Sequence, residues 1–126
     1  MTTDSVDPTA DIVQRILETG AGVGLLLDSL MRLSKAEWTP PKKSMFSKKP
    51  GYLQLGEWRY TEAADGRLHS AHAVAGVVIA SGELSPHEAG ANVAAALQKY
   101  IRDHGPRAGD DVQAILAGLS AALGDG

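Results

Sequence analysis

Apolar residues recur at three- and four-residue steps along the first third of the chain, a spacing typical of one face of an α-helix. The stripe runs from Ile12 to Leu33, and Asp7-Pro8 places an N-cap residue and a first-turn proline just before it. We therefore expect a long helix over residues 8–34. Such a helix would extend about 40 Å, longer than a compact chain of this size is wide, which favours pairing with another chain.

Three glycines interrupt this stripe, and each costs about 1 kcal/mol relative to alanine in a helix interior. Two interpretations are open. Either the helix breaks into two shorter pieces at Gly20 to Gly24, or Gly20 and Gly24 lie on one face and let another backbone approach closely. In the second case we expect Gly20, Gly24 and Leu27 to contact a second copy of the chain.

Alternation of apolar and polar positions predicts two strands in the middle of the chain, over residues 52–61 and 67–80. Asp65-Gly66 between them is a hairpin turn signal, because glycine readily adopts the positive φ that such a turn requires. Gly76 indicates a bulge or bend within the second strand, which is long for a single strand.

Two helices are expected in the last third of the chain. Ser85-Pro86-His87-Glu88 combines an N-cap serine, a first-turn proline and a glutamate that can reach back to the cap, and His104-Gly105-Pro106 ends that helix. Asp110 or Asp111 can cap a final helix whose apolar stripe runs from Val112 to Leu123. The expected fold is therefore α+β: a long N-terminal helix, a basic loop, a β-hairpin and two C-terminal helices.

Composition supports one small domain over residues 1–126, with residues 1–7 as a flexible tail. Hydrophobic residues make up 44% of the chain but aromatic residues only 5%, so the core must be mainly aliphatic. A chain of this size buries about two thirds of its unfolded surface, and an isolated hairpin is marginally stable, so a second copy could extend the sheet. We expect a homo-oligomer, most simply a dimer.

The absence of cysteine excludes disulfides, thiolate metal sites and cysteine nucleophiles, and is consistent with a reducing compartment. The acidic start lacks the features of a secretory signal, and no apolar run approaches the roughly 20 residues that cross a bilayer. These observations predict a cytoplasmic protein.

The segment 36–51 is expected to be a basic loop, because Pro40-Pro41 and Pro50-Gly51 are incompatible with a regular element. The stretch from Arg32 to Lys49 holds six basic residues and one acidic residue, whereas the rest of the chain holds six basic and fourteen acidic residues. A solvated loop, an acidic protein partner, an anionic membrane surface and a nucleic-acid backbone all suit this pattern. The expected contact residues are Lys42, Lys43, Phe46, Lys48 and Lys49.

Candidate chemistry is sparse. The glycines at 20, 22 and 24 follow a helical pattern rather than a strand, which argues against a phosphate-binding loop. No serine lies in a nucleophile elbow, so we expect neither catalytic residues nor a cofactor. His69 and His72 are three apart on a strand and point to opposite faces, so no metal site is expected.

A pocket between the helices and the hairpin is a further possibility, lined by Trp58, Tyr60, His69 and His72. Trp58 and Tyr60 share one face of the first strand, while Glu57 and Arg59 share the other. Aromatic residues at strand spacing are more often part of a core than of a pocket. The pocket interpretation therefore needs a cavity at which polar groups converge.

The segments Glu57-Trp58-Arg59-Tyr60 and Asp65-Gly66-Arg67-Leu68-His69-Ser70-Ala71-His72 resemble small actinobacterial proteins to which no activity is assigned. The resemblance implies a bacterial cytoplasmic setting. Three hypotheses follow for function: a non-catalytic, self-associating accessory or adaptor protein; a peripheral binder of anionic surfaces through the basic segment 32–49; or a small ligand-binding protein or enzyme with a pocket near Trp58 and His72.

Overall fold

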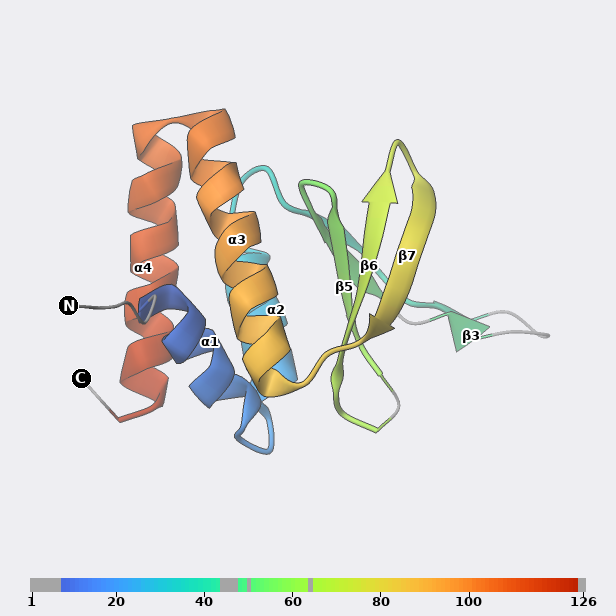
Figure 1. The fold of residues 1–126 in the computed structure, drawn as a ribbon, viewed down its shortest axis with the longest axis horizontal. Helices are drawn as coiled ribbons and strands as arrows, with labels where there is room; N and C mark the ends of the chain where they lie inside the picture. Colours follow the sequence, from blue (N-terminus) through green and yellow to red (C-terminus); the bar gives the residue numbers. More distant parts are fainter. Residues whose placement is uncertain (1–7, 44–47, 50, 64, 125–126) are drawn as a thin grey trace.

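A computed structural model describes residues 8–43, 48–49, 51–63 and 65–124. The described chain forms two layers, an antiparallel sheet and a helical layer on one side of it (Figure 1). The helices are α1 (Pro8–Leu17), α2 (Gly22–Leu30), α3 (Pro86–His104) and α4 (Pro106–Ala122). The helical layer is two helices deep, so that α2 and α3 lie next to the sheet and α1 and α4 pack behind them. The overall class is α+β.

The main sheet has five strands in the order β1-β4-β5-β6-β7, and every neighbouring pair is antiparallel. Its strands are β1 (Glu37–Thr39), β4 (Tyr52–Leu55), β5 (Trp58–Glu62), β6 (Leu68–Val74) and β7 (Val77–Glu83). A separate two-stranded ribbon of β2 (Lys42–Lys43) and β3 (Lys48–Lys49) projects away from the helices (Figure 1).

The expected long helix over residues 8–34 is wrong. The chain forms two short helices instead, and the break lies at the glycine cluster. A Cβ on Gly22 would fall on the backbone carbonyl of Ile16, so the sharp turn between α1 and α2 requires glycine there. The turn lets both helices direct their apolar faces into one core, which an unbroken helix of that length could not do.

The expected hairpin and basic loop are also corrected. Each predicted strand is a pair of strands: a turn at Gly56-Glu57 separates β4 from β5, and a turn at Ala75-Gly76 separates β6 from β7. Gly56 and Gly76 both have positive φ, which is the reason that the chain reverses at these points. The segment 36–51, expected to be a loop, contributes β1 to the sheet and also forms β2 and β3.

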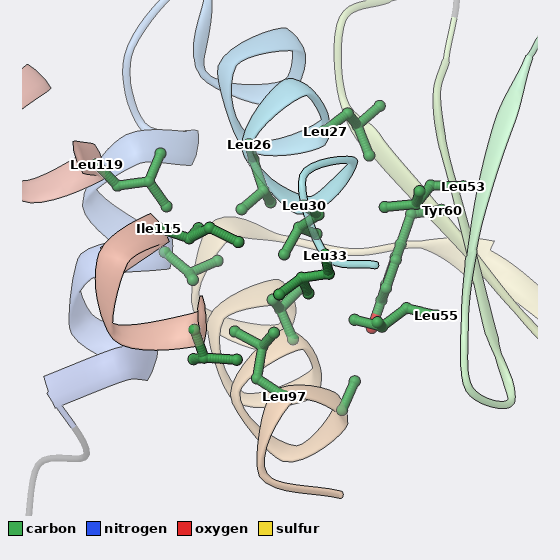
Figure 2. Close-up of a cluster of buried hydrophobic side chains, with 14 of the residues drawn as sticks. Leu26, Leu27, Leu30, Leu33, Leu53, Leu55, Tyr60, Leu97, Ile115 and Leu119 are labelled. Atoms are coloured by element: carbon green, nitrogen blue, oxygen red, sulfur yellow. The ribbon is translucent and has the colours of Figure 1, made fainter. Parts of the chain in front are cut away.

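The core lies between the two layers (Figure 2). Leu53, Leu55 and Tyr60 point from the sheet toward the leucines of α2, and all three are buried. Leu97 of α3 and Ile115 and Leu119 of α4 close the far side of this cluster. The core is thus mainly aliphatic, as the composition predicted.

The start of α3 is confirmed, because Ser85 and Glu88 form the predicted capping box. The start of α4 is not: this helix begins at Pro106, directly after Gly105, rather than at Asp110 or Asp111. Gly105 has a φ of 85°, which lets two long helices follow one another with a single residue between them.

Candidate functional site

One face of the sheet carries no helix (Figure 1). Strand register places Gln54, Arg59, Ala71 and Ser81 in one row across β4, β5, β6 and β7. Because side chains alternate between faces along a strand, this row lies opposite the face that carries Leu53, Leu55 and Tyr60. The uncovered face therefore presents polar residues over a small apolar floor.

Arg59 is held by two neighbouring side chains on this face. Its guanidinium carbon lies 4.1 Å from the centroid of the Tyr52 ring, and its Nε donates a 3.2 Å hydrogen bond to Oε1 of Gln54. The Gln54 amide nitrogen in turn donates to the Gly56 carbonyl at 2.8 Å, which leaves Oε1 facing Arg59. Among the described residues, no carboxylate lies within ion-pair distance of Arg59.

A surface groove of about 330 Å³ is lined in part by Arg59. Ala71 and Val78 form its apolar floor, and its other lining residues are Tyr52, Arg59, Thr61, His69 and Ser81. The Thr61 hydroxyl donates to the Gly51 carbonyl at 2.5 Å, and its oxygen can still accept a hydrogen bond. The arrangement has the features of a small-molecule site: an apolar surface with a few polar groups at its margin.

The structure does not bring the four predicted pocket residues together. Tyr60 is fully buried beneath the helices, whereas Trp58 is half-buried at the margin of the core. His72 faces Trp58 across β5 and β6, with ring centroids 4.9 Å apart. His69 lies on the opposite, uncovered face and lines the groove beside Arg59.

His72 also approaches Glu57, with 3.4 Å between Nε2 and Oε2. Both side chains are substantially exposed, so this contact is a surface pair whose net contribution to stability is small. Within the described part of the chain, no three histidine, aspartate or glutamate residues are grouped so that they could hold a metal ion.

The three residues that were expected to contact a second copy, Gly20, Gly24 and Leu27, do not form one exposed surface. Gly20 is exposed and Gly24 half-buried, and a Cβ at either would meet no atom within 4 Å. Leu27 is buried in the core. The close backbone approach occurs instead at Gly90 of α3, where a Cβ would lie 2.6 Å from the carbonyl oxygen of Ala10 in α1.

Four of the five lysines of the basic segment 32–49 belong to the β2–β3 ribbon, whereas Lys35 precedes β1. The register of the ribbon pairs Lys42 with Lys49 and Lys43 with Lys48, so like charges occupy opposite positions twice. Phe46, the expected apolar contact of this segment, lies outside the described residues. Trp38 precedes the ribbon on β1 and is exposed.

The outer strand β7 carries a set of exposed apolar residues that the sequence analysis did not single out. Val77, Val78 and Ile79 are 64%, 47% and 64% exposed, and Val74 of β6 is exposed beside them. The register pairs His72 with Ala80 and Ala73 with Val78, so Ile79 forms a bulge. A continuous apolar run such as this one predicts a buried strand, and only the strand order reveals that it forms an edge.

Together, these features define a two-layer α+β protein with an uncovered sheet face and an apolar outer edge. The chain belongs to the DUF5073 family, described as a domain of unknown function, whose family model matches residues 1–121. Neither the curated proteins nor the solved structures contain a significant match to it. In the described part of the chain, no helix combines the length and apolar character needed to cross a membrane.

Proposed function

We propose that this protein is a self-associating accessory or adaptor protein whose two copies join through β7. The observation that carries the proposal is the exposure of three consecutive apolar residues, Val77 to Ile79, on a seven-residue strand at the edge of the sheet. An edge strand presents unpaired backbone N–H and C=O groups, which a second strand can pair.

The two edges of the sheet differ in how they are protected. The opposite edge, β1, is only three residues long and contains Glu37. In contrast, β7 has no charged residue before Glu83, its last position. Edge strands that remain unpaired usually carry lysine, proline, an inward-pointing charge or a bulge that prevents another strand from pairing. Of these protective features, β7 has the bulge at Ile79. The asymmetry favours β7 as the surface that meets another copy.

An antiparallel pair of β7 strands would be related by a two-fold axis perpendicular to the sheet. If the axis passes near Val78, the three apolar residues of one copy lie against those of the other. This arrangement makes a continuous sheet with both helical layers on the same side. The interface is isologous and therefore closes at two copies, which limits further growth.

Sedimentation velocity over a micromolar concentration series tests the proposal. We expect the wild-type protein to sediment as a dimer, and Ile79→Lys to sediment as a monomer, because a charged lysine would then lie opposite Val77 of the other copy, and lysine on an edge strand opposes pairing. Leu25→Lys is the matched control: Leu25 is an exposed apolar residue on α2, next to Gly24, and we expect its variant to remain dimeric.

The possible outcomes separate the parts of the proposal. A monomeric wild-type protein would overturn self-association. A dimeric Ile79→Lys variant would overturn β7 as the interface, and if Leu25→Lys were then monomeric, the contact would lie on α2 beside Gly24. Amide dispersion in the NMR spectrum of each variant distinguishes dissociation from unfolding.

A second candidate function is the binding of an anionic membrane surface through the β2–β3 ribbon. The register places lysines at opposite positions of the ribbon twice, and an anionic surface would balance this concentration of basic residues. Each lysine near such a surface contributes about 1 kcal/mol, and an exposed tryptophan such as Trp38 suits the lipid headgroup region.

Co-sedimentation with vesicles tests this candidate. We expect binding to phosphatidylglycerol-containing vesicles at low salt, little binding to pure phosphatidylcholine, and loss of binding at high salt. Replacing the four ribbon lysines by glutamine should abolish binding, whereas Lys99→Gln on α3 should not. Binding that does not change with salt concentration, or that persists after replacement of the four lysines, would exclude the ribbon as the binding surface. Stronger binding to single-stranded DNA than to vesicles would indicate nucleic acid as the ligand instead.

A further inference from the structure

The groove beside Arg59 opens on the uncovered sheet face, and Val78 and Ser81 of β7 are among its lining residues. The pairing proposed above uses the backbone edge of β7 and not this face. Backbone pairing through β7 would leave the uncovered face open in both copies. We propose that this groove binds a small organic monocarboxylate, with the carboxylate on the Arg59 guanidinium and the apolar part of the ligand on Ala71 and Val78.

The first argument is that Arg59 is held in place before any ligand arrives. The Tyr52 ring lies 4.1 Å from its guanidinium carbon, and Gln54 accepts from its Nε. Gln54 is itself held by the Gly56 carbonyl, so the restraint extends back to the turn between β4 and β5. A guanidinium that is already oriented loses less conformational entropy when it binds, which strengthens anion recognition.

The second argument concerns the unused hydrogen-bonding capacity of Arg59. Its Nε is engaged by Gln54, but none of the described carboxylates forms an ion pair with its terminal nitrogens. Those nitrogens form the planar fork that matches the two oxygens of a carboxylate. Arg67, by comparison, is paired with both Asp65 and Glu83.

The third argument selects a monoanion over a multiply charged ligand. Arg59 is the single lysine or arginine among the described residues that line the groove. Glu37 shares a second depression with Arg59, where Gln54 lies between them across the strands. A phosphate dianion or a nucleic-acid backbone would meet one cation and a nearby carboxylate, whereas a single carboxylate balances the one guanidinium.

The size and surface of the groove agree with a small ligand. Its volume of about 330 Å³ lies at the lower end of the range of small-molecule sites, roughly 300 to 1,000 Å³. Ala71 and Val78 offer a short apolar surface, while Ser81 and Thr61 place hydroxyl oxygens at the margin. A compact ring or short chain attached to a carboxylate fits these dimensions.

NMR titration of residues 1–126 with benzoate tests the proposal, with benzyl alcohol as the neutral analogue and inorganic phosphate as the alternative anion. We expect saturable benzoate shifts centred on the amides of Arg59, Ala71 and Val78. Benzyl alcohol should bind at least about tenfold more weakly, because it cannot form the charge-assisted pair. Phosphate should give no saturable shifts at these positions.

Variants at Arg59 sharpen the test. Arg59→Gln should weaken benzoate binding at least about tenfold, and Arg59→Lys should cause an intermediate loss, since lysine retains charge but lacks the planar fork. Arg67→Gln, which removes an exposed arginine already paired with acids, should bind benzoate as the wild type does. Arg59→Lys keeps a cation on a long aliphatic side chain, so it serves if Arg59→Gln does not fold.

Four results would overturn the proposal: benzoate shifts that do not saturate or that lie elsewhere, equal binding of benzoate and benzyl alcohol, tighter binding of phosphate than of benzoate, or wild-type benzoate affinity in Arg59→Lys and Arg59→Gln. None of these results depends on whether the protein is a dimer. A monomeric protein that binds benzoate through Arg59 would support this inference and overturn only the proposed pairing.

Discussion

The hydroxyl of Tyr60 donates a 2.5 Å hydrogen bond to Oδ1 of Asn92, and this bond joins the centre of the sheet to α3. Tyr60 is fully buried, whereas Asn92 lies at the margin of the core. A buried tyrosine hydroxyl requires a partner, because an unpaired polar group in a core is costly. The bond therefore helps to determine where α3 rests on the sheet.

Removing the Tyr60 hydroxyl should destabilise the protein modestly. We expect Tyr60→Phe to lower the free energy of unfolding by about 0.5 to 1.5 kcal/mol, the net value of one hydrogen bond, while the ring continues to fill the core. Tyr52→Phe is the matched control, because Tyr52 lies on the uncovered face and contacts Arg59 through its ring. Urea unfolding measures the loss of stability in each variant. Equal losses in Tyr60→Phe and Tyr52→Phe would contradict the role of the hydrogen bond to Asn92.

Alkaline pH should reduce the contribution of Tyr60 to the stability of the folded protein. Burial raises the pKa of Tyr60 above the ordinary value of 10.0, so the folded protein keeps this hydroxyl protonated while the unfolded chain ionises. The stability that Tyr60 contributes is thus complete below pH 10.0 and is lost as the pH rises above it. The difference in unfolding free energy between wild type and Tyr60→Phe should shrink over that range. A constant difference would contradict this prediction.

Alanine substitutions at two helical glycines should act in opposite directions. Gly90→Ala places a Cβ 2.6 Å from the Ala10 carbonyl oxygen, so α1 and α3 must move apart, at a cost of about 1 to 3 kcal/mol. Gly24→Ala meets no atom within 4 Å and should stabilise by about 0.5 to 1 kcal/mol, since alanine favours helix. Thermal unfolding compares them. A neutral Gly90→Ala would contradict the close approach of the two helices.

The capping box of α3 should make the stability of the protein weakly dependent on pH in the acid range. The backbone N–H of Ser85 donates to the Glu88 carboxylate, and this bond, with the Ser85 side chain, lowers the pKa of Glu88 below its ordinary value of 4.5. The corresponding stability is complete above pH 4.5 and is lost as the pH falls through the lowered pKa. Glu88→Gln can retain the cap but does not titrate, so its stability should lack this part of the acid dependence.

A separate substitution measures the other half of the cap. The Ser85 hydroxyl accepts a 3.2 Å hydrogen bond from the Glu88 backbone N–H. We expect Ser85→Ala to cost about 1 kcal/mol and to lower the helical signal of α3, because one N-terminal N–H loses its partner. Ser34→Ala, at an exposed serine outside every helix and strand, is the control and should be close to neutral. Comparable losses in both variants would contradict the capping role.

The sequence correctly predicted those features that depend only on residues a few positions apart in the chain. The capping box at Ser85 and Glu88 is confirmed, because the hydrogen bonds that start a helix involve residues three apart. The reversal near Asp65-Gly66 and the end of α3 at Gly105 also follow from the residues that occupy those positions. The break between α1 and α2 was one of two interpretations, and the local pattern could not choose between them.

The candidate site depends on relations that the local pattern does not contain. The alternation along the strand correctly placed Arg59 on the opposite face from Trp58 and Tyr60. Which of the two faces the helices cover depends on how the whole chain packs, and the alternation does not indicate it. Likewise, the run from Val77 to Ile79 is apolar enough for a central strand, and its exposure follows from the strand order.

The sequence by itself determined the capped start of α3, the turn at Asp65-Gly66, the aliphatic character of the core and the uneven distribution of charge, because each depends on neighbouring residues or on composition. Only the tertiary structure decided that five strands form one sheet, that β7 is its edge and that Arg59 lies on Tyr52 beside an open groove. These relations come from contacts between distant segments, and their energies depend on how the whole chain packs rather than on any one stretch of it.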